Sequence, residues 1–291
     1  MNYRPLALAA SLCATAFPLC AQDSTSTSGD PFTAFFAHWA ARVHEAQESQ
    51  PNWITPLATT TPRLEEEFRY DQYFETLKTG ASLDNYGAGK GLELIPFSPV
   101  EIIVAVPAYQ VRTGPTAASG FADWPGVLVK YRIASSNNAH GNYCVTVFAQ
   151  YGLPTGIPAY TSKNHVFTPT LAAGKGWGDF DIQATFGCAM PTHDNSTAGR
   201  AYATNVTAQY RFDDVFWPEL EMNRTDWSGG ARDGRSQTFI TPGVVFGRFP
   251  IGHFKMIVGV GYQASVAQNY AKGPSTPTYN HNWILSGRTS F

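Results

Sequence analysis

The feature of this sequence that most constrains its fold is an alternation of apolar and polar residues over its C-terminal three quarters. Near the end of the chain, for example, Phe254 and Met256 flank Lys255. Successive side chains of a β-strand point to opposite faces, so this period predicts strands with one apolar and one polar face. We identify twelve such segments: 66–77, 83–95, 100–111, 126–134, 143–153, 165–173, 178–190, 201–212, 216–225, 236–248, 253–265 and 279–291.

The predicted strands and their connections have the lengths of a membrane barrel. A tilted strand needs about ten residues to cross a bilayer. Short connections such as "GKGW", "DDV" and "FPIG" alternate with long ones such as "PTGIPAYTSKN" and "PTHDNSTAGR", as the periplasmic turns and extracellular loops of outer-membrane barrels do. We therefore predict an all-β fold, an antiparallel up-and-down transmembrane β-barrel of about 12 strands with one N-terminal helix. A soluble secreted β-sandwich is the alternative.

Charge and hydropathy agree with a barrel. The formal net charge is −2 and only 14% of the residues are charged, whereas nucleic-acid-binding proteins usually carry a basic surface. We therefore expect no nucleic-acid partner. Beyond the N-terminus the chain lacks the run of ~18 apolar residues that a transmembrane helix requires. Because an unpaired backbone group in hydrocarbon costs several kcal/mol, a sheet that spans the membrane must close on itself.

The first residues have the pattern of a secretory signal. Arg4 precedes the apolar stretch "PLALAASLCATAFPLCA", and Ala21 is the expected last residue before cleavage. We divide the chain into the signal peptide (1–21), a segment with a flexible spacer, an amphipathic helix and a Pro/Thr-rich connector (22–62), and the barrel (63–291). The expected location is the bacterial outer membrane, with its lipid as a partner. Cys144 and Cys188 fall on opposite faces of their strands, so we expect no disulfide between them.

One helix is predicted, at about residues 31–48. Asp30 can cap its N-terminus and Pro31 can occupy the first helical position. An apolar stripe at helical spacing makes the helix a candidate plug that packs against or inside the barrel mouth; its members are Phe32, Phe35, Phe36 and Trp39. The alternative is a helix that lies on the periplasmic surface or at the membrane interface.

Charged residues with inferred lumen parity form the candidate lumen wall. They are Lys130, Arg132, Asp179, Asp181, Arg211, Glu219, Glu221, Lys255 and Arg288. Both signs are present, so the residues can select or orient a solute in a pore. Equally, they can pair between strands and fill the lumen. We expect no cofactor, since neither arrangement calls for one.

Little in the sequence points to an enzyme. The seven histidines show no metal-binding spacing. The segment "THDNS" gathers His193, Asp194 and Ser196 in one predicted external loop, which leaves a lipase or acyltransferase as an alternative. We expect a protein that is not an enzyme.

The last strand carries a candidate assembly signal. Trp283, Leu285 and Phe291 share the predicted lipid-facing parity, while Asn282 and Arg288 share the other. We predict that this strand pairs with the first one to close the barrel. The resemblance to outer-membrane barrels implies that the terminal aromatic strand is read by the barrel-assembly machinery, which would be a partner during biogenesis.

The chain from about Pro56 to Phe291 resembles a family of outer-membrane barrels labelled as transporters of the MetA pathway of phenol degradation. The resemblance rests on "TPRLEEEFRYDQ" (Thr61 to Gln72), on "GVLVKYRI" before "VTVFAQYGLPTG", and on "GWGDFDIQATFG" (Gly176 to Gly187). It implies a transport role for hydrophobic or aromatic solutes. We therefore expect a porin-like channel or uptake protein through which small organic solutes diffuse passively, with a closed structural barrel as an alternative.

Overall fold

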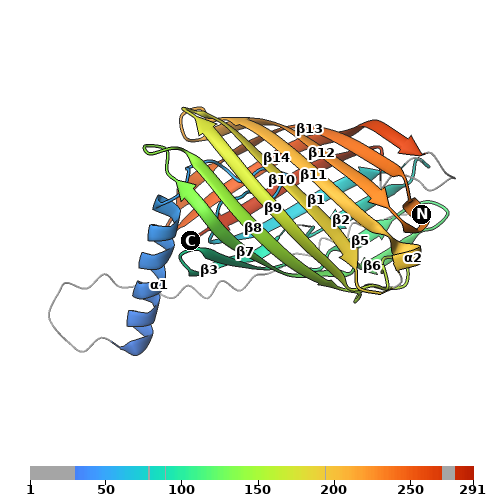
Figure 1. Ribbon diagram of the computed structural model, residues 1–291, viewed down its shortest axis with the longest axis horizontal. Helices are drawn as coiled ribbons and strands as arrows, with labels where there is room; N and C mark the ends of the chain where they lie inside the picture. Colours follow the sequence, from blue (N-terminus) through green and yellow to red (C-terminus); the bar gives the residue numbers. More distant parts are fainter. Residues whose placement is uncertain (1–29, 78, 89, 194, 271–278) are drawn as a thin grey trace, which may run out of the picture.

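The computed structural model describes residues 30–77, 79–88, 90–193, 195–270 and 279–291 (Figure 1). Long strands make up most of this part of the chain, together with the long helix α1 (Pro31–Glu48) and the short helices α2 (Asn195–Ala198) and η1 (Gly230–Arg232). The strands are β1 (Glu67–Thr76), β2 (Ser82–Tyr86), β3 (Gly91–Phe97), β4 (Val100–Val104), β5 (Tyr109–Arg112), β6 (Ala118–Phe121), β7 (Trp124–Ser136), β8 (Tyr143–Leu153), β9 (Val166–Trp177), β10 (Phe180–Pro191), β11 (Arg200–Tyr210), β12 (Phe216–Ser228), β13 (Arg235–Ile251), β14 (Phe254–Tyr270) and β15 (His281–Ser290).

The strands form one closed antiparallel barrel, as predicted. From β7 to β15 each strand pairs with its neighbours in chain order, and β15 pairs with β1 from Glu67 opposite Ser290 to Thr76 opposite His281. Closure gives the wall strands hydrogen-bonded partners on both sides, except at the short β6, for which pairing with β5 alone is found among the described residues. Three strands of the wall are interrupted, and their halves are β2 and β3, β4 and β5, and β6 and β7. Counted with these halves joined, the wall has 12 strands.

The three interruptions lie in consecutive wall strands, at residues 87–90, 105–108 and 122–123. The sequence predicted 83–95 and 100–111 as continuous strands. At the third interruption the backbones come very close, because a Cβ atom on Gly126 (φ +80°) would lie only 1.7 Å from the carbonyl oxygen of Tyr151. Gly126 lies in a β-bulge between Trp124 and Val127, at a position that only glycine can occupy.

Outward and inward side chains alternate along the wall. In β15, Trp283 and Leu285 are exposed on the outside, while Asn282, Ser286 and Arg288 are buried inside, as predicted. Tyr279, just before this strand, has the same parity as Trp283 and is therefore expected on the lipid-facing side, but the structure differs. It turns inward, stacks on Phe239 and hydrogen-bonds to Gln263, because it precedes the point where strand pairing fixes the parity.

The two ends of the barrel differ. At one end, which we call the turn end, short connections join β3 to β4, β9 to β10 and β13 to β14. β1 begins and β15 ends there, as an even number of strands requires (Figure 1). Most of the longer connections lie at the other end, the loop end, and this alternation confirms the predicted pattern.

The helix α1 begins as predicted but is not the plug. The Asp30 carboxylate accepts a hydrogen bond from the amide of Phe32 (3.3 Å), and Pro31 is the first helical residue. The helix lies crosswise at the turn end, outside the lumen (Figure 1). Phe32, Phe35 and Phe36 are 67%, 55% and 52% exposed, so the prediction that they plug the lumen is wrong. No helix in the described part of the chain is long and apolar enough to span a membrane.

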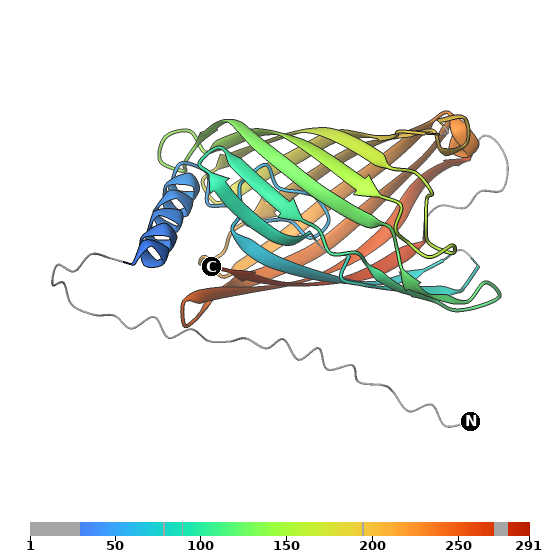
Figure 2. The ribbon, with the colours of Figure 1, turned by 90° about the horizontal axis from the view of Figure 1, so that it is seen from below.

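The lumen is instead occupied by the connector that follows α1. This segment, residues 50–66, is called the plug below; it loops into the barrel and returns to the start of β1 (Figure 2). Its Trp53, Ile54, Leu57 and Leu64 are each at most 4% exposed. The domain division placed most of this segment outside the barrel, whereas it forms the barrel's core. Its prolines prevent a helix or a paired strand, and its apolar side chains fill the interior.

Candidate functional site: the occluded lumen

Two glutamates of β12 bind the tip of the plug. Glu219 accepts a hydrogen bond from the amide of Leu57 (3.0 Å), and Glu221 accepts from the amides of Ala58 and Thr59 (2.7 Å each). They lie two residues apart, so both point into the lumen. Amides of a loop without regular structure need acceptors when buried, and these carboxylates supply them.

Cationic wall residues bind the carbonyl groups of the plug. Arg69 donates to the carbonyls of Pro56 (3.2 Å) and Leu57, and Arg288 donates to that of Pro56 (2.9 Å) and to the preceding carbonyl. Arg69 also pairs with Asp71 at 2.8 Å. β1 and β15, the two strands that close the barrel, thus share one plug peptide as a partner. The plug is held by charge-assisted bonds to its backbone on opposite sides.

A buried ion pair holds the returning half of the plug. Lys130 and Glu101 are fully buried, with Nζ and Oε1 at 2.9 Å. Lys130 also donates to the carbonyl of Arg63 (3.0 Å), and Glu101 accepts from the amide of Glu65 (2.7 Å). Buried charges require both a counter-charge and further hydrogen bonds, and the plug backbone provides those bonds. Removing the plug would therefore expose or orphan this pair.

Glycines in the wall make room for Leu57. This side chain is fully buried among Ile54, Trp217 and Ile284 in the principal apolar cluster. A Cβ atom would lie 2.5 Å from a Leu57 methyl group at both Gly243 and Gly259, and 2.8 Å at Gly261. The inward positions of β13 and β14 are thus shaped to the plug.

A second pair of glycines accommodates Trp53. A Cβ atom on Gly174 would lie 2.4 Å from the indole ring, and one on Gly176 would lie 2.7 Å from its Nε1. Both glycines belong to β9, in the stretch "AAGKGW". The apolar part of the plug therefore has two sockets, one for Leu57 and one for Trp53.

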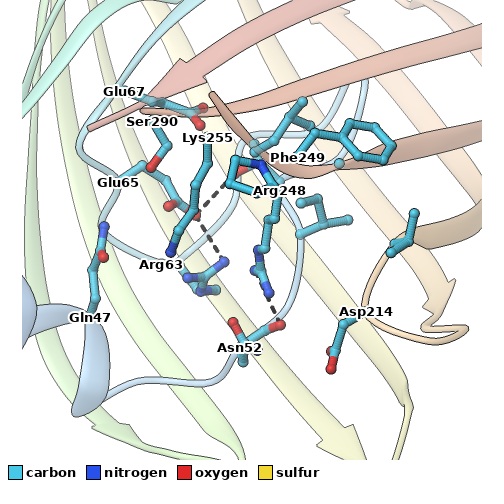
Figure 3. Close-up of a pocket in the computed structure, with 16 residues that line it drawn as sticks. Gln47, Asn52, Arg63, Glu65, Glu67, Asp214, Arg248, Phe249, Lys255 and Ser290 are labelled. Atoms are coloured by element: carbon cyan, nitrogen blue, oxygen red, sulfur yellow. Dashed lines mark hydrogen bonds and ion pairs between the residues drawn. The ribbon is translucent and has the colours of Figure 1, made fainter. Parts of the chain in front are cut away.

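A cavity of about 520 Å³ lies on the turn-end side of the plug (Figure 3). Its wall is charged, with Arg63, Glu65, Arg248 and Lys255 among the lining residues. Arg248 spans the cavity and donates to the carbonyl of Trp53 at 2.7 Å. The plug therefore forms part of the wall of this cavity.

A second cavity, of about 210 Å³, borders the plug at the interrupted part of the wall. One part of its lining is apolar, with Leu57, Ile103 and Leu128; another is polar, with Arg69 and Gln150. The two cavities therefore border different parts of the plug. The second is large enough for several water molecules or a small organic molecule.

Toward the loop end, amide side chains cross-link the lumen. Asn223 donates to Asn205 (3.1 Å) and to the hydroxyl of Thr59 (3.2 Å), and it accepts from Gln263 (3.0 Å). Asn205 in turn donates to Thr185 (2.9 Å). This network extends from the plug tip across β10, β11, β12 and β14.

The nine predicted wall residues divide into three groups. Lys130, Asp181, Glu219, Glu221 and Arg288 are buried in the lumen, and all except Asp181 hydrogen-bond to the plug backbone. Asp181 accepts instead from Gln183, which donates to the plug carbonyl of Ile54. Arg132 lies at the turn end and binds the carbonyl of Ala46 in α1 (2.6 Å).

The remaining three predicted residues lie at the rim. Arg211 pairs with Asp179 at 2.7 Å and with Asp214 at 3.0 Å, which fastens two neighbouring turns together. Lys255 is exposed and points into the turn-end cavity (Figure 3). Among the described residues, none of these three forms a hydrogen bond or ion pair with the plug, because each lies at or just beyond an end of its strand.

Sequence reasoning missed several partners of the plug. Arg69, Asp71 and Glu101 have the same inward parity as the predicted wall residues and could have been found by extending that rule to the first and third predicted strands. The plug itself gave a weaker signal. Trp53, Ile54 and Leu57 are large apolar residues in a Pro/Thr-rich connector, where exposed loops usually lack them.

The joint between the plug and α1 contains a buried carboxyl group. Glu66 accepts hydrogen bonds from the amide of Ile95 (2.6 Å) and the indole of Trp39 (2.8 Å). Burial raises the pKa of Glu66, although these two donors and Arg42 act in the opposite direction. Trp39, the one predicted plug residue that touches the barrel's interior, thus fixes the helix to the rim.

The candidate hydrolase loop has no described catalytic arrangement. The Nδ1 of His193 lies 2.8 Å from the hydroxyl of Thr192. Asp194 and the side chain of Ser196 lie outside the described residues, so this alternative stays a prediction. Both cysteines that the structure describes are free, as predicted. No group of three or more His, Cys, Asp or Glu side chains suited to a metal occurs within the described ranges.

These features define a class of protein: a 12-stranded transmembrane β-barrel of the outer-membrane type, with a polar inner wall and an inserted plug. The sequence matches no family model and no curated protein. Among solved structures, the fold is similar to that of an outer-membrane channel from Pseudomonas putida F1, with a TM-score of 0.50 and 12% identity over 77% of this chain and 94% of that chain. The NanC porin (TM-score 0.46, 8% identity, 77% and 98% coverage) and the KdgM porin (0.42, 11%, 77% and 99%) also align.

Proposed function

We propose that this protein is an outer-membrane channel for small organic solutes, held closed by the plug. Solutes would diffuse passively through the barrel when the plug moves, without a cofactor or an energy source. The similar fold of a protein described as an outer-membrane channel supports this proposal. Export through a signal peptide at residues 1–21, which lie outside the described residues, is part of the same proposal.

The observation that carries the proposal is that the plug, a segment outside the barrel wall, occupies the lumen. A barrel with a purely structural role can be filled by its own wall side chains, as small barrels are. Here the wall glycines at positions 243, 259 and 261 leave space, and Leu57 of the plug fills it. Because the wall binds mainly plug backbone, the plug can leave without breaking any strand pairing of the barrel.

The cavity beside the interrupted wall favours solutes with an apolar body and a polar group. Its Leu57, Ile103 and Leu128 can contact an aromatic or aliphatic body, and Arg69 or Gln150 can bind an oxygen atom. This lining is consistent with the aromatic or hydrophobic solutes that the resemblance to the phenol-degradation barrels implies. The solute class and that family membership are both part of the proposal.

A reversible lock on the plug tests the proposal. Asn223 of β12 donates to the hydroxyl of Thr59 in the plug (3.2 Å), so Thr59→Cys and Asn223→Cys would place two thiols on facing side chains, and mass spectrometry would check that a disulfide forms between them. The variant would carry Cys144→Ser and Cys188→Ser, because these are the two other described cysteines. Liposomes would report uptake of a small phenol, and planar bilayers would report conductance.

We expect the oxidised lock to block solute flux and conductance, and reduction to restore both in the same sample. The single-cysteine variants serve as controls and should respond to neither treatment. A deletion of residues 51–62 should conduct constitutively. If the reduced protein passes no solute and only the deletion variant conducts, the barrel is a closed structural element and the proposal fails. Equal flux in the oxidised and reduced forms would also contradict it.

A further inference from the structure

The helix α1 has two halves with different surroundings. The C-terminal half is fixed to the barrel rim, where Val43 and Ala46 are buried against Leu64 of the plug and Ile95 of β3. Trp39 completes this contact through its hydrogen bond to Glu66 (2.8 Å). One face of the helix therefore points at the barrel.

The N-terminal half continues the same apolar face without a protein partner among the described residues. Phe32, Phe35 and Phe36 lie on the stripe that leads to Trp39, Val43 and Ala46, at helical spacings of three and four residues. The rings of Phe32 and Phe36 are 4.7 Å apart and those of Phe35 and Phe36 5.3 Å apart. Three phenyl rings in edge-to-face contact, each more than half exposed, form a compact apolar surface.

The placement of the helix gives this surface a direction. α1 lies across the turn end of the barrel, and its N-terminal end reaches past the wall near β3 (Figure 1). The apolar face of α1 contacts the rim over Ile95. One or two turns before Trp39, where the helix extends past the rim, the same face is directed toward the outside of the wall. Phe97, at the end of β3, is 62% exposed on that outside.

We propose that the N-terminal half of α1 is an interfacial anchor, which inserts Phe32, Phe35 and Phe36 into the lipid leaflet at the turn end. The occupant of this surface is lipid because the surface continues the outer face of a transmembrane wall. A helix that lies in the plane of the interface with one aromatic face is the form such anchors take. This inference depends on the barrel fold and holds whether or not the lumen conducts.

The opposite face of the helix suits water. In the C-terminal half this face carries His44, Glu45 and Glu48, all exposed, and in the N-terminal half it carries the small residues Thr33, Ala34 and Ala37. The cation Arg42 lies over the Trp39 ring at 4.9 Å. The helix has no cluster of basic residues that would bind anionic headgroups. Insertion should therefore depend on apolar area, and it should be insensitive to the anionic lipid content of the membrane and to salt.

Collision accessibility of a nitroxide label tests the anchor in the whole protein. In a Cys144→Ser, Cys188→Ser background, the label is placed at Phe36→Cys on the apolar face or at Ala34→Cys on the opposite face. Both positions lie in the same half of the helix and are exposed in the structure, so they are matched in distance from the barrel. The protein is reconstituted alone into phosphatidylcholine vesicles.

We expect the ratio of oxygen to nickel-complex collisions to be several-fold higher at position 36 than at position 34, and unchanged by added salt or anionic lipid. Adding Phe32→Ser and Phe35→Ser should lower the ratio at position 36 toward that at position 34, while heat-modifiable migration on gels shows that the barrel still folds. Equal ratios at the two positions would overturn the anchor. Protection at position 36 that disappears when labelled protein is diluted with unlabelled protein would identify a second copy as the occupant and would also overturn it.

Discussion

Truncating Leu57 should release the plug without disturbing the barrel. Leu57 is fully buried, and three of its neighbours in the wall, Gly243, Gly259 and Gly261, have no side chain that could move into the space left by Leu57→Ala. Buried Leu→Ala substitutions cost about 2–5 kcal/mol, and more where the site cannot collapse. When the plug is displaced from the lumen, Leu57 is no longer buried. The substitution therefore makes the free energy of plug docking less favourable and leaves the free energy of strand pairing unchanged.

A loss of about 3.5 kcal/mol would shift the equilibrium constant between the docked and the undocked plug roughly 300-fold toward the undocked state, since 1.4 kcal/mol corresponds to a factor of ten. Single-channel recording in planar bilayers measures this change as the fraction of time in the conducting state. Leu57→Met, which conserves volume, should stay close to the wild type. Leu171→Ala, which removes a leucine that is 52% exposed on the outer wall, should leave channel opening unaltered.

The result that would refute this reasoning is a Leu57→Ala barrel that folds, inserts and opens as rarely as the wild type. Folding is checked by heat-modifiable migration on gels, so a loss of structure cannot imitate a closed channel. Frequent opening in Leu171→Ala would equally refute it, because the effect would then follow from general destabilisation.

Three further predictions concern other parts of the chain. Glu221→Gln replaces the carboxylate that accepts two plug amides, and it should raise the open fraction by about tenfold or more, as charge-assisted bonds contribute about 1.5–3 kcal/mol each. Asp123, at the interruption between β6 and β7, accepts from the amide and hydroxyl of Ser162 in the loop between β8 and β9 (2.7 Å each). Burial acts to raise the pKa of Asp123, but the hydrogen bonds outweigh burial and lower it. The ionised Asp123 therefore holds the loop at neutral pH and releases it as the pH falls below about 4, the ordinary pKa of an aspartate. A spin label at Lys163→Cys would report the release as increased mobility. In the Asp123→Asn variant the label should be mobile at every pH. Deleting Phe291 should reduce the amount of assembled barrel in the outer membrane, measured as heat-modifiable protein, and unchanged assembly would contradict the role of the terminal aromatic residue.

The wall of the barrel could be predicted from the sequence because its determinants are local. Hydrocarbon outside and a polar lumen inside impose the same period on every strand, so Trp283 and Arg288 reveal their faces without knowledge of their neighbours. The inward direction of Lys130 and Glu221 follows from the same rule. The hydrogen-bond partners of Lys130 and Glu221 could not be predicted, because pairing in the lumen depends on which strands face one another.

The plug could not be predicted in this way. Residues 50–66 have no period, and their position depends on sockets formed by strands more than 100 residues later in the chain. The helix α1 packs against the barrel mouth, as one of the predicted arrangements has it, but the residues that make this contact could not be predicted for a related reason. Its apolar stripe shows that one face must be covered, but Phe32 and Val43 on that stripe have different surroundings, and only the position of the rim decides which of them meets protein.

The plug enters and leaves the lumen through the same opening. Its first residue follows α1 and its last precedes β1, and both of these lie at the turn end (Figure 2). No chain end has to pass through the barrel, so the loop can insert after the wall has closed. Once displaced, it remains covalently tethered at both ends, at an effective concentration near its binding site that is on the order of millimolar. In the proposed channel, closure would therefore be an intramolecular reaction that restores itself: each opening would be transient, and its duration would be set by the re-docking rate of the tethered loop and not by the supply of a diffusing partner.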